Sequence, residues 1–161
     1  MSQDFTVWLV TNPVSTWLIR NLASPLDPIV FKATNGRFFT MGRASQGMAT
    51  ITMKGRRTGK PRAVHLAAIP YEGDHLLVAS AMGQERHPGW RYNLEANPDV
   101  EVQMKEDRFQ ARAEVLSDEE KEKVWDTIRE VIPMIHVYET RTDRNIRVFR
   151  LVRSTAQPTG A

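Results

Sequence analysis

The chain has 161 residues, of which 41% are hydrophobic and 25% charged, which is enough apolar content for the core of a single domain. This composition excludes disordered, collagen-like and membrane-spanning classes. The formal net charge is +3, from 22 Lys and Arg against 19 Asp and Glu. Five of the basic residues lie in residues 54–62, KGRRTGKPR, which hold no acidic residue, so the rest of the chain is net negative. The charge therefore indicates one local anionic partner rather than a protein that coats DNA.

The chain has no cysteine, which excludes disulfides, thiolate metal sites and a cysteine nucleophile. Its four histidines lie far apart and none forms an i, i+4 pair, so we predict no metal site. We find neither a basic region before an early apolar run nor a segment that could span a bilayer, and we expect a cytoplasmic protein. Residues 1–161 are expected to form one domain, with a helical extension over residues 1–35 and a flexible tail over residues 154–161.

A helix is predicted to begin at Asn12-Pro13, where an N-cap residue precedes proline at the first helical position. We expect its apolar face to pack on the domain, as amphipathic helices usually do. The residues of this face are Val14, Trp17, Leu18 and Leu22. The alternative is a peripheral membrane contact, because Trp8 and Trp17 have few charges around them. Ser24-Pro25 and Asp27-Pro28 then interrupt the chain before a short apolar stretch.

Six strands are predicted, and most of them alternate apolar with polar residues, as half-buried strands do. They are expected over Met48–Met53, Arg62–Tyr71, His75–Ser80, Val100–Met104, Phe109–Val115 and Ile146–Leu151. One helix is expected between His87-Pro88 and Asn97-Pro98, and a second between a capping box at Ser117 and Pro133. The first three strands leave no room for crossover helices, so the pattern favours a mainly β (α+β) fold: a small antiparallel barrel with peripheral helices.

Residues 54–62 form the strongest local motif. A glycine-rich turn lets backbone N–H groups face an anion, and arginine supplies bidentate contacts to phosphate or carboxylate. The motif is not a P-loop, because only three residues separate Gly55 from Gly59, Pro61 replaces the Ser/Thr, and a strand follows. An ordinary solvated hairpin turn is the alternative. The five cations without an acidic neighbour favour the anion site.

Three further features have structural as well as functional interpretations. Tyr138 lies in a late loop, where its phenol could donate a hydrogen bond to a substrate or simply lie at the rim. Core packing is the favoured interpretation of Trp90 and Tyr92. Asp143 and Arg144 are interpreted as a pair within a turn.

Four motifs in this order resemble the deazaflavin-dependent nitroreductase family of actinobacteria, which uses coenzyme F420. They are GRRTGKPR after an alternating strand, VAS-x-x-G, HPGW-x-x-NL-x-ANP, and TDR before the last strand. The resemblance covers roughly Met48 to Arg153 and matches only loosely before it. It implies a six-stranded antiparallel split β-barrel with the deazaflavin in a groove. It also implies a polyanionic ligand, because the coenzyme carries a phosphodiester and an oligoglutamate tail.

The resemblance assigns cofactor-binding roles to four groups of residues. The basic turn would hold the tail and the phosphate through Lys54, Arg56, Arg57, Thr58, Gly59, Lys60 and Arg62. The next strand would pass the ring at Val64, His65 and Leu66. The phosphate region would lie against Ser80, Ala81, Met82 and Gly83, where Ala81 replaces a lysine of many relatives and its contact passes to Arg86 or to backbone amides. Trp90 and Asn93 match the family residues of the third motif.

The activity implied is transfer of a hydride from reduced deazaflavin to a small electron-poor acceptor, such as a quinone, an activated enone or a nitro compound. We expect Tyr138 to donate a hydrogen bond or proton to the acceptor, with Met134 and His136 beside it. His65 and His136 are lesser candidates. Relatives carry several aromatic residues in this loop and only Tyr138 remains here, so reduction of nitroimidazoles is not carried over.

Two alternatives remain open. One is a split-barrel protein that binds FMN, the second choice of cofactor, or a tetrapyrrole. The other is a non-enzymatic binder of anions or nucleic acid, which is disfavoured because KGRRTGKPR contains no aromatic residue for base stacking. Either a monomer or a homodimer is compatible with the sequence.

Overall fold

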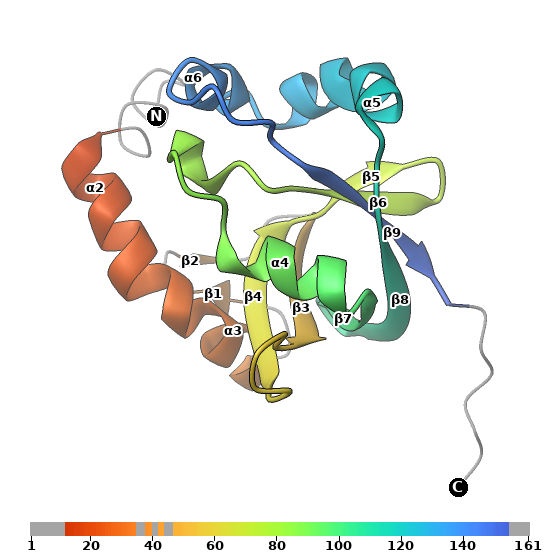
Figure 1. Cartoon of the computed structure of the whole chain (residues 1–161). Coiled ribbons are helices and arrows are strands. Elements are labelled where there is room, and N and C mark those ends of the chain that lie inside the picture. Colours follow the sequence, from red (N-terminus) through yellow and green to blue (C-terminus); the bar gives the residue numbers. More distant parts are fainter. Residues whose placement is uncertain (1–11, 35–37, 40–41, 44–46, 155–161) are drawn as a thin grey trace, which may run out of the picture.

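The computed structural model describes residues 12–34, 38–39, 42–43 and 47–154 (Figure 1). The strands are β1 (Phe38–Phe39), β2 (Gly42–Arg43), β3 (Met48–Lys54), β4 (Pro61–Ala67), β5 (Ile69–Tyr71), β6 (Asp74–Val78), β7 (Asp99–Met104), β8 (Asp107–Val115) and β9 (Val148–Arg153). The helical elements are α2 (Pro13–Leu18), η1 (Ile19–Ala23), α3 (Ser24–Ala33), η2 (Ala81–Gly83), α4 (Gly89–Ala96), α5 (Asp118–Val131) and α6 (Ile135–Glu139).

The main sheet has seven strands in the order β4-β3-β7-β8-β9-β6-β5, and all neighbours are antiparallel. Both edge strands belong to one run of chain, because β4 ends at Ala67 and β5 begins at Ile69. The sheet is therefore curled, with its first and last strands joined through Ala68, and helices surround it (Figure 1). The expected mainly β, α+β class with an antiparallel sheet and peripheral helices is confirmed.

The expected number of six strands is wrong by one, because the strand predicted over Arg62–Tyr71 is divided. The N–H of Ala68 donates to the carbonyl oxygen of Gly47 at 2.6 Å. Residues before this point pair with β3, and residues after it pair with β6. Pro70, which has no N–H to donate, lies on the short edge strand β5. A separate pair of short strands, β1 and β2, was not predicted at all.

The interior of the curled sheet follows the predicted alternation. Ala49, Ile51 and Met53 of β3 are at most 2% exposed and belong to the first of two buried clusters, together with Leu94 of α4 and Phe149 of β9. The second cluster lies between the sheet and helices α5 and α6. Its buried members are Ile69, Leu76, Leu116, Val124, Ile128, Ile135, Tyr138 and Val148.

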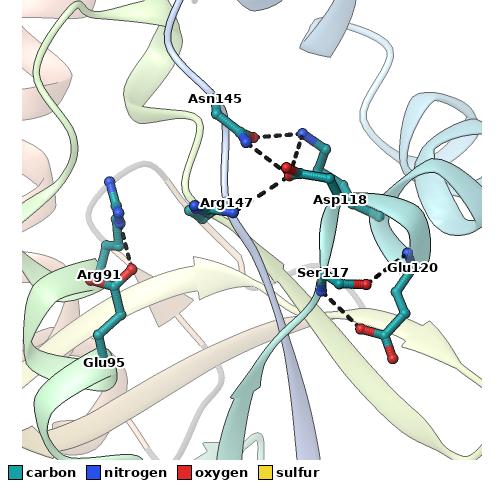
Figure 2. Close-up of polar contacts among 8 residues, drawn as sticks. Arg91, Glu95, Ser117, Asp118, Glu120, Asn145 and Arg147 are labelled. Atoms are coloured by element: carbon teal, nitrogen blue, oxygen red, sulfur yellow. Dashed lines mark hydrogen bonds and ion pairs between the residues drawn. The ribbon is translucent and has the colours of Figure 1, made fainter.

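Helix α5 begins at the predicted capping box. The Ser117 hydroxyl accepts a hydrogen bond from the Glu120 N–H at 3.2 Å, and the Ser117 N–H donates to the Glu120 carboxylate at 2.8 Å (Figure 2). Val124 and Ile128 of the predicted apolar stripe are buried, whereas Val131 is 52% exposed. The helix ends just before Pro133, as expected.

The N-terminal helix begins as predicted, with the Asn12 side chain accepting from the Val14 N–H at 2.9 Å. Its expected packing on the domain is wrong. Val14, Trp17, Leu18 and Leu22 are 46–69% exposed. Contact with the sheet is made by α3, where Phe31 is fully buried.

Helix α3 lies within the helical extension expected over residues 1–35, but it was not predicted as a separate helix, because its two prolines were taken as interruptions. Pro25 lies in the first turn, where N–H groups have no partner within the helix, and the chain reaches it through the helical turn η1.

None of the described helices has an apolar stretch long enough to cross a membrane. Trp8 and residues 155–161 of the expected tail lie outside the described residues.

Candidate functional site

The basic turn, residues 54–62, is the hairpin connection between β3 and β4. Register places Lys54 opposite Pro61, which leaves residues 55–60 as the loop. The Gly55 N–H donates to the Lys60 carbonyl oxygen, and the Gly59 N–H donates to the Gly55 carbonyl oxygen, both at 2.9 Å. Gly59 has a φ of +68°, and a Cβ on Gly55 would lie 3.1 Å from the Lys60 oxygen. Both glycines are therefore needed for this tight loop.

The side chains of the basic turn project into solvent without acidic partners. Within the described residues, none of its five cations is in an ion pair, in contrast to six arginines elsewhere in the described part of the chain. Those with a carboxylate partner are Arg91, Arg112, Arg129, Arg147, Arg150 and Arg153. The positive charge of the turn is thus uncompensated, as a site for an anion requires.

Helix α4 lies against the basic turn and fixes its backbone. The Asn93 side chain accepts a hydrogen bond from the Arg56 N–H at 3.1 Å, and the Asn97 side chain donates to the Lys54 carbonyl oxygen at 3.3 Å. Asn93 was predicted as a cofactor contact, and the contact found is one that positions the turn. Asn97 was not predicted, although the i, i+4 spacing of the two asparagines places them on one helix face.

Two aromatic residues of α4 have different surroundings. Trp90 is half-buried against Phe149, with ring centres 5.7 Å apart, so its packing role is clear. The Tyr92 ring lies below the Arg56 guanidinium, 4.6 Å from its centre. This cation–π contact places an aromatic ring beside the basic turn from another element, which the sequence of the turn could not show.

The loop after β6 adopts an unusual backbone conformation. Ser80 is in the right-handed helical region, and Ala81, Met82 and Gly83 follow with φ values of +46°, +56° and +75°. A right-handed residue followed by a left-handed one directs successive N–H groups into a concavity that suits anions. Within the described residues, the N–H groups of Ser80, Ala81 and Met82 donate no hydrogen bond.

Gly83 brings this loop against helix α6. A Cβ at Gly83 would lie 2.8 Å from the Arg141 Cβ and 2.9 Å from both the Cα and the carbonyl oxygen of Tyr138. The predicted phosphate-side and acceptor-side residues are therefore adjacent. Arg86, two residues beyond Gln84, is exposed.

The prediction that Arg144 pairs with Asp143 is wrong. The Arg144 guanidinium instead donates to backbone oxygens of the loop after β6. The bonds run to Gln84 at 2.6 Å, to Ala79 at 2.9 Å and to Ser80. Burial lowers the pKa of Arg144. The TDR motif contains Arg144, but a local sequence pattern cannot predict hydrogen bonds to carbonyl groups 60 residues away.

His87 connects this loop to α4. Arg144 Nη1 lies 3.2 Å from His87 Nδ1, so that nitrogen is the acceptor and the ring is neutral. The His87 ring is edge-on to Tyr92, with centres 6.1 Å apart. Burial lowers the pKa of His87, and the charges of Arg91 and Arg144 lower it further. Ser80, Arg144, His87, Tyr92 and Arg56 thus form a continuous series of contacts from the loop to the basic turn.

The three predicted ring-side residues on β4 divide between its two faces. Val64 and Leu66 pack on the first buried cluster. His65 points to the other face, where its Nδ1 lies 3.1 Å from the Thr50 hydroxyl and its ring lies 4.4 Å from that of Phe31. Burial lowers the pKa of His65, against a smaller opposing effect of Asp27.

The predicted acceptor-side residues lie at helix α6. Tyr138 is only 5% exposed, and its hydroxyl forms no hydrogen bond with another described residue. Burial raises the pKa of Tyr138, so the phenol is neutral at physiological pH. Met134 is half-buried against the second cluster, whereas His136 is exposed with Nδ1 close to the Pro133 carbonyl oxygen. His65 is on a different face and does not join this group.

A polar cavity of about 490 Å³ lies between α5, α6 and the segment 142–146, and it contains no predicted site residue. Its charged side chains are largely paired: Glu139 accepts from both Trp125 and Arg129, and Lys121 donates to Asn145. The described residues contain no group of three or more His, Asp or Glu suited to a metal ion.

Comparison with known proteins gives a consistent result. A family model described as F420H(2)-dependent quinone reductase matches residues 29–153. An F420H(2)-dependent quinone reductase of Mycobacterium tuberculosis is 31% identical over 146 residues, covering 87% of this chain and 98% of the relative. A solved structure described as a domain-swapped dimer has 30% identity and a TM-score of 0.63, covering 86% of this chain and 98% of its own. A solved F420-H2 dependent reductase has 36% identity and a TM-score of 0.61, covering 66% and 94%.

Proposed function

The chain belongs to the F420H(2)-dependent quinone reductase family, and from that membership we propose that it oxidises reduced F420 with a quinone-type acceptor. The class expected from sequence, an F420-dependent oxidoreductase, is confirmed, and quinones are among the acceptors expected. A hydride and a proton pass from reduced F420 to the quinone, and the products are oxidised F420 and the hydroquinone. The observation that carries the proposal is the uncompensated basic turn.

The basic turn fits the polyanionic part of the cofactor. Arg56, Arg57 and Lys60 are exposed, close in sequence and free of ion pairs within the described part of the chain. Guanidinium groups bind carboxylate and phosphate oxygens in a bidentate manner. We assign the glutamate tail to this turn, together with Lys54, Thr58, Gly59 and Arg62.

The loop after β6 fits the phosphodiester. The N–H groups of Ser80, Ala81 and Met82 are available, and Ala81 offers no charged side chain. Backbone amides therefore replace the lysine contact that the family resemblance implies, with Gly83 and exposed Arg86 at the end of the loop. The ring would lie between this loop, Trp90 and the β4 segment 64–66.

The protein residues position and polarise, while the bound deazaflavin supplies the hydride. We place the acceptor beside Tyr138, Met134 and His136. Because burial keeps the Tyr138 phenol protonated, it can donate a hydrogen bond to the acceptor oxygen as negative charge develops there. Half-buried Met134 offers apolar surface to a quinone ring and helps to exclude water.

We further propose that the protein forms a homodimer through its N-terminal apolar face, the exposed side chains of α2, η1 and α3. They are Val14, Trp17, Leu18, Leu22, Leu26 and Ile29, all at least 46% exposed. Exposed apolar groups of this extent mark interaction surfaces. A relative with 30% identity is described as a domain-swapped dimer, which supports a second copy as the occupant.

The dimer is tested by light scattering after size-exclusion chromatography of the full chain and of Trp17→Ser/Leu22→Ser. We expect a dimer that the double substitution converts to a monomer. A native monomer at all concentrations would contradict it, and flotation of that monomer with anionic phospholipid vesicles would support the membrane contact instead.

The alternative cofactors and partners are not favoured by the comparisons. Anaerobic titration with F420 and with FMN tests the choice directly, and we expect F420 to bind at least tenfold more tightly. Tight FMN binding without F420 binding would overturn it. For nucleic acid, Tyr92 does supply one ring beside Arg56, yet the family relationship gives no support to an RNA-binding role.

A further inference from the structure

We propose that Arg144 is a positioning residue for the phosphate of the cofactor, which it serves by orienting peptide groups rather than by touching the anion. The proposal rests on the proposed function, because it concerns the same cofactor. Arg144 binds the carbonyl oxygens of Ala79, Ser80 and Gln84 on the inner side of the loop after β6. The amide N–H groups of the same peptides are then turned outward.

The planar peptide group fixes the direction of these N–H groups. In a trans peptide the carbonyl of residue i and the N–H of residue i+1 point in opposite directions, and the chain has no cis peptide within the described residues. The carbonyls of Ala79 and Ser80 point to Arg144. The N–H groups of Ser80 and Ala81 therefore point away from it, and these donors are free of hydrogen bonds in the described part of the chain.

The electrostatics favour an anion on the outer side. Arg144 is a partly buried cation with no carboxylate partner among the described residues, and its remaining contact is a neutral His87. The peptide dipoles present their negative ends to Arg144 and their positive ends to the opposite side of the loop. An anion bound at the outer N–H groups would interact favourably with both the amides and the cation behind them.

The residues that follow Arg144 in the chain are bonded to helix α5. The Asn145 side chain donates to Asp118 at 2.8 Å and accepts from Lys121 at 2.6 Å, and Arg147 lies 3.4 Å from the same Asp118 oxygen (Figure 2). These contacts fasten the segment around Arg144 to the first turns of α5. A segment fastened in this way favours a loop that is already ordered when the ligand binds, which would reduce the entropic cost of binding.

The role requires arginine rather than any cation. The Nε, Nη1 and Nη2 atoms of Arg144 form a planar set of donors, and they bind three carbonyl oxygens and His87 Nδ1. Lysine lacks such a set of donors. Arg144→Lys keeps the charge and loses the geometry. Arg144→Gln loses both.

The test measures equilibrium binding by fluorescence for three deazaflavins with the full chain. The first probe ends in the ribityl hydroxyl, the second adds the phosphate and lactate without glutamate, and the third is complete F420. In the wild type we expect affinity to rise at each step. The phosphate step is the ratio of the affinities of the second and first probes, and the glutamate step is the ratio for the third and second probes. In Arg144→Gln and Arg144→Lys we expect the phosphate step to be about tenfold or more smaller, while the glutamate step remains.

Matched variants separate this role from a general loss of structure. Arg153→Gln changes an exposed arginine that pairs with Asp107 and has no contact with the loop, so it should leave both steps unchanged, whereas Arg57→Gln should reduce only the glutamate step. The inference is overturned if Arg144→Gln keeps the phosphate step, or if it weakens the phosphate-free probe equally. The proposed function fails separately, if the wild type binds none of the three probes.

A measurement on the wild type needs no variant to fold. In nitrogen-15 NMR spectra, the amide signals of Ser80, Ala81 and Met82 should shift when the second probe is added and not when the phosphate-free probe is added. Equal shifts with both probes would contradict the proposal.

Discussion

Asn93 Oδ1 accepts a hydrogen bond from the backbone N–H of Arg56 at 3.1 Å, and this contact ties helix α4 to the basic turn. The turn is thus presented by a helix whose own first turn carries Trp90. Positive charge that would otherwise lie on a free hairpin is held in a defined position. A charged turn fixed in this way favours a specific ligand over general affinity for polyanions.

Removal of this hydrogen bond should affect binding more than folding. We expect Asn93→Ala to weaken F420 binding about three- to tenfold and to lower the free energy of unfolding by about 1 kcal/mol. Fluorescence titration and urea denaturation measure the two effects. Glu95→Gln on the same helix, whose carboxylate pairs with Arg91, should change neither, and an Asn93→Ala protein with native affinity would refute the positioning role.

Charge reversal in the basic turn should weaken cofactor binding while the fold stays intact. We predict that Arg57→Glu lowers F420 affinity about tenfold or more at low salt and reduces the dependence of affinity on salt concentration. Arg108→Glu is the matched control, because Arg108 is an exposed cation at the opposite end of β7 and β8. Circular dichroism should be unchanged in both. Equal losses in the two variants would show that only overall charge matters.

Gly83 is expected to tolerate no side chain. Gly83→Ala combines a φ of +75° with a Cβ 2.8–2.9 Å from Arg141 and Tyr138, and we expect it to lower the free energy of unfolding by roughly 2 to 4 kcal/mol. Gly73→Ala has a similar φ of +84° with open space around it, so it should cost only about 1 kcal/mol. Equal losses in the two variants would mean that the contact with α6 is unimportant.

His87 should make cofactor binding sensitive to acid. Its pKa is lowered by burial and by Arg91 and Arg144, against a smaller opposing effect of Glu95. A histidine with a lowered pKa in the folded protein contributes stability above its ordinary pKa, and that stability is lost as the pH falls through the lowered pKa. Protonation would also place a second cation beside Arg144 and release the loop.

We therefore predict that F420 affinity falls with decreasing pH below about 6.5, the ordinary histidine value. His87→Gln, which keeps a hydrogen-bond acceptor, should retain affinity and lose most of this dependence. His65 and His75 also have lowered pKa values, mainly through burial, so the global stability of the variant should still fall in acid. A pH profile unchanged by His87→Gln would contradict this assignment.

Tyr138 should matter for turnover more than for structure. We expect Tyr138→Phe to reduce kcat/KM with a quinone about tenfold to a hundredfold, because one donor to the developing negative charge is lost. F420 affinity should not change, and because the ring stays in the buried cluster the stability should change little. An unchanged kcat/KM with several acceptors would exclude an important role for the hydroxyl.

The elements that the sequence predicts correctly are those that local interactions determine. Alternation located β3, the capping box located α5, and the basic turn emerged from charge alone. The features that the sequence does not predict depend on distant contacts. A hydrogen bond from Ala68 to Gly47 divides a strand, and Arg144 binds carbonyl groups about 60 residues away. The amphipathic pattern at Trp17 located a helix with an apolar face, but the expected packing of that face was wrong, since the described domain leaves it exposed.

The most direct test of the central claim is anaerobic mixing of the protein with reduced F420 and a soluble naphthoquinone, followed by absorbance. The account predicts that oxidised F420 appears in a one-to-one ratio with the hydroquinone. It also predicts a rate that falls at least tenfold when Arg57→Glu is assayed below saturation. A rate no higher than that without protein, or equal turnover with reduced FMN alone, would contradict it.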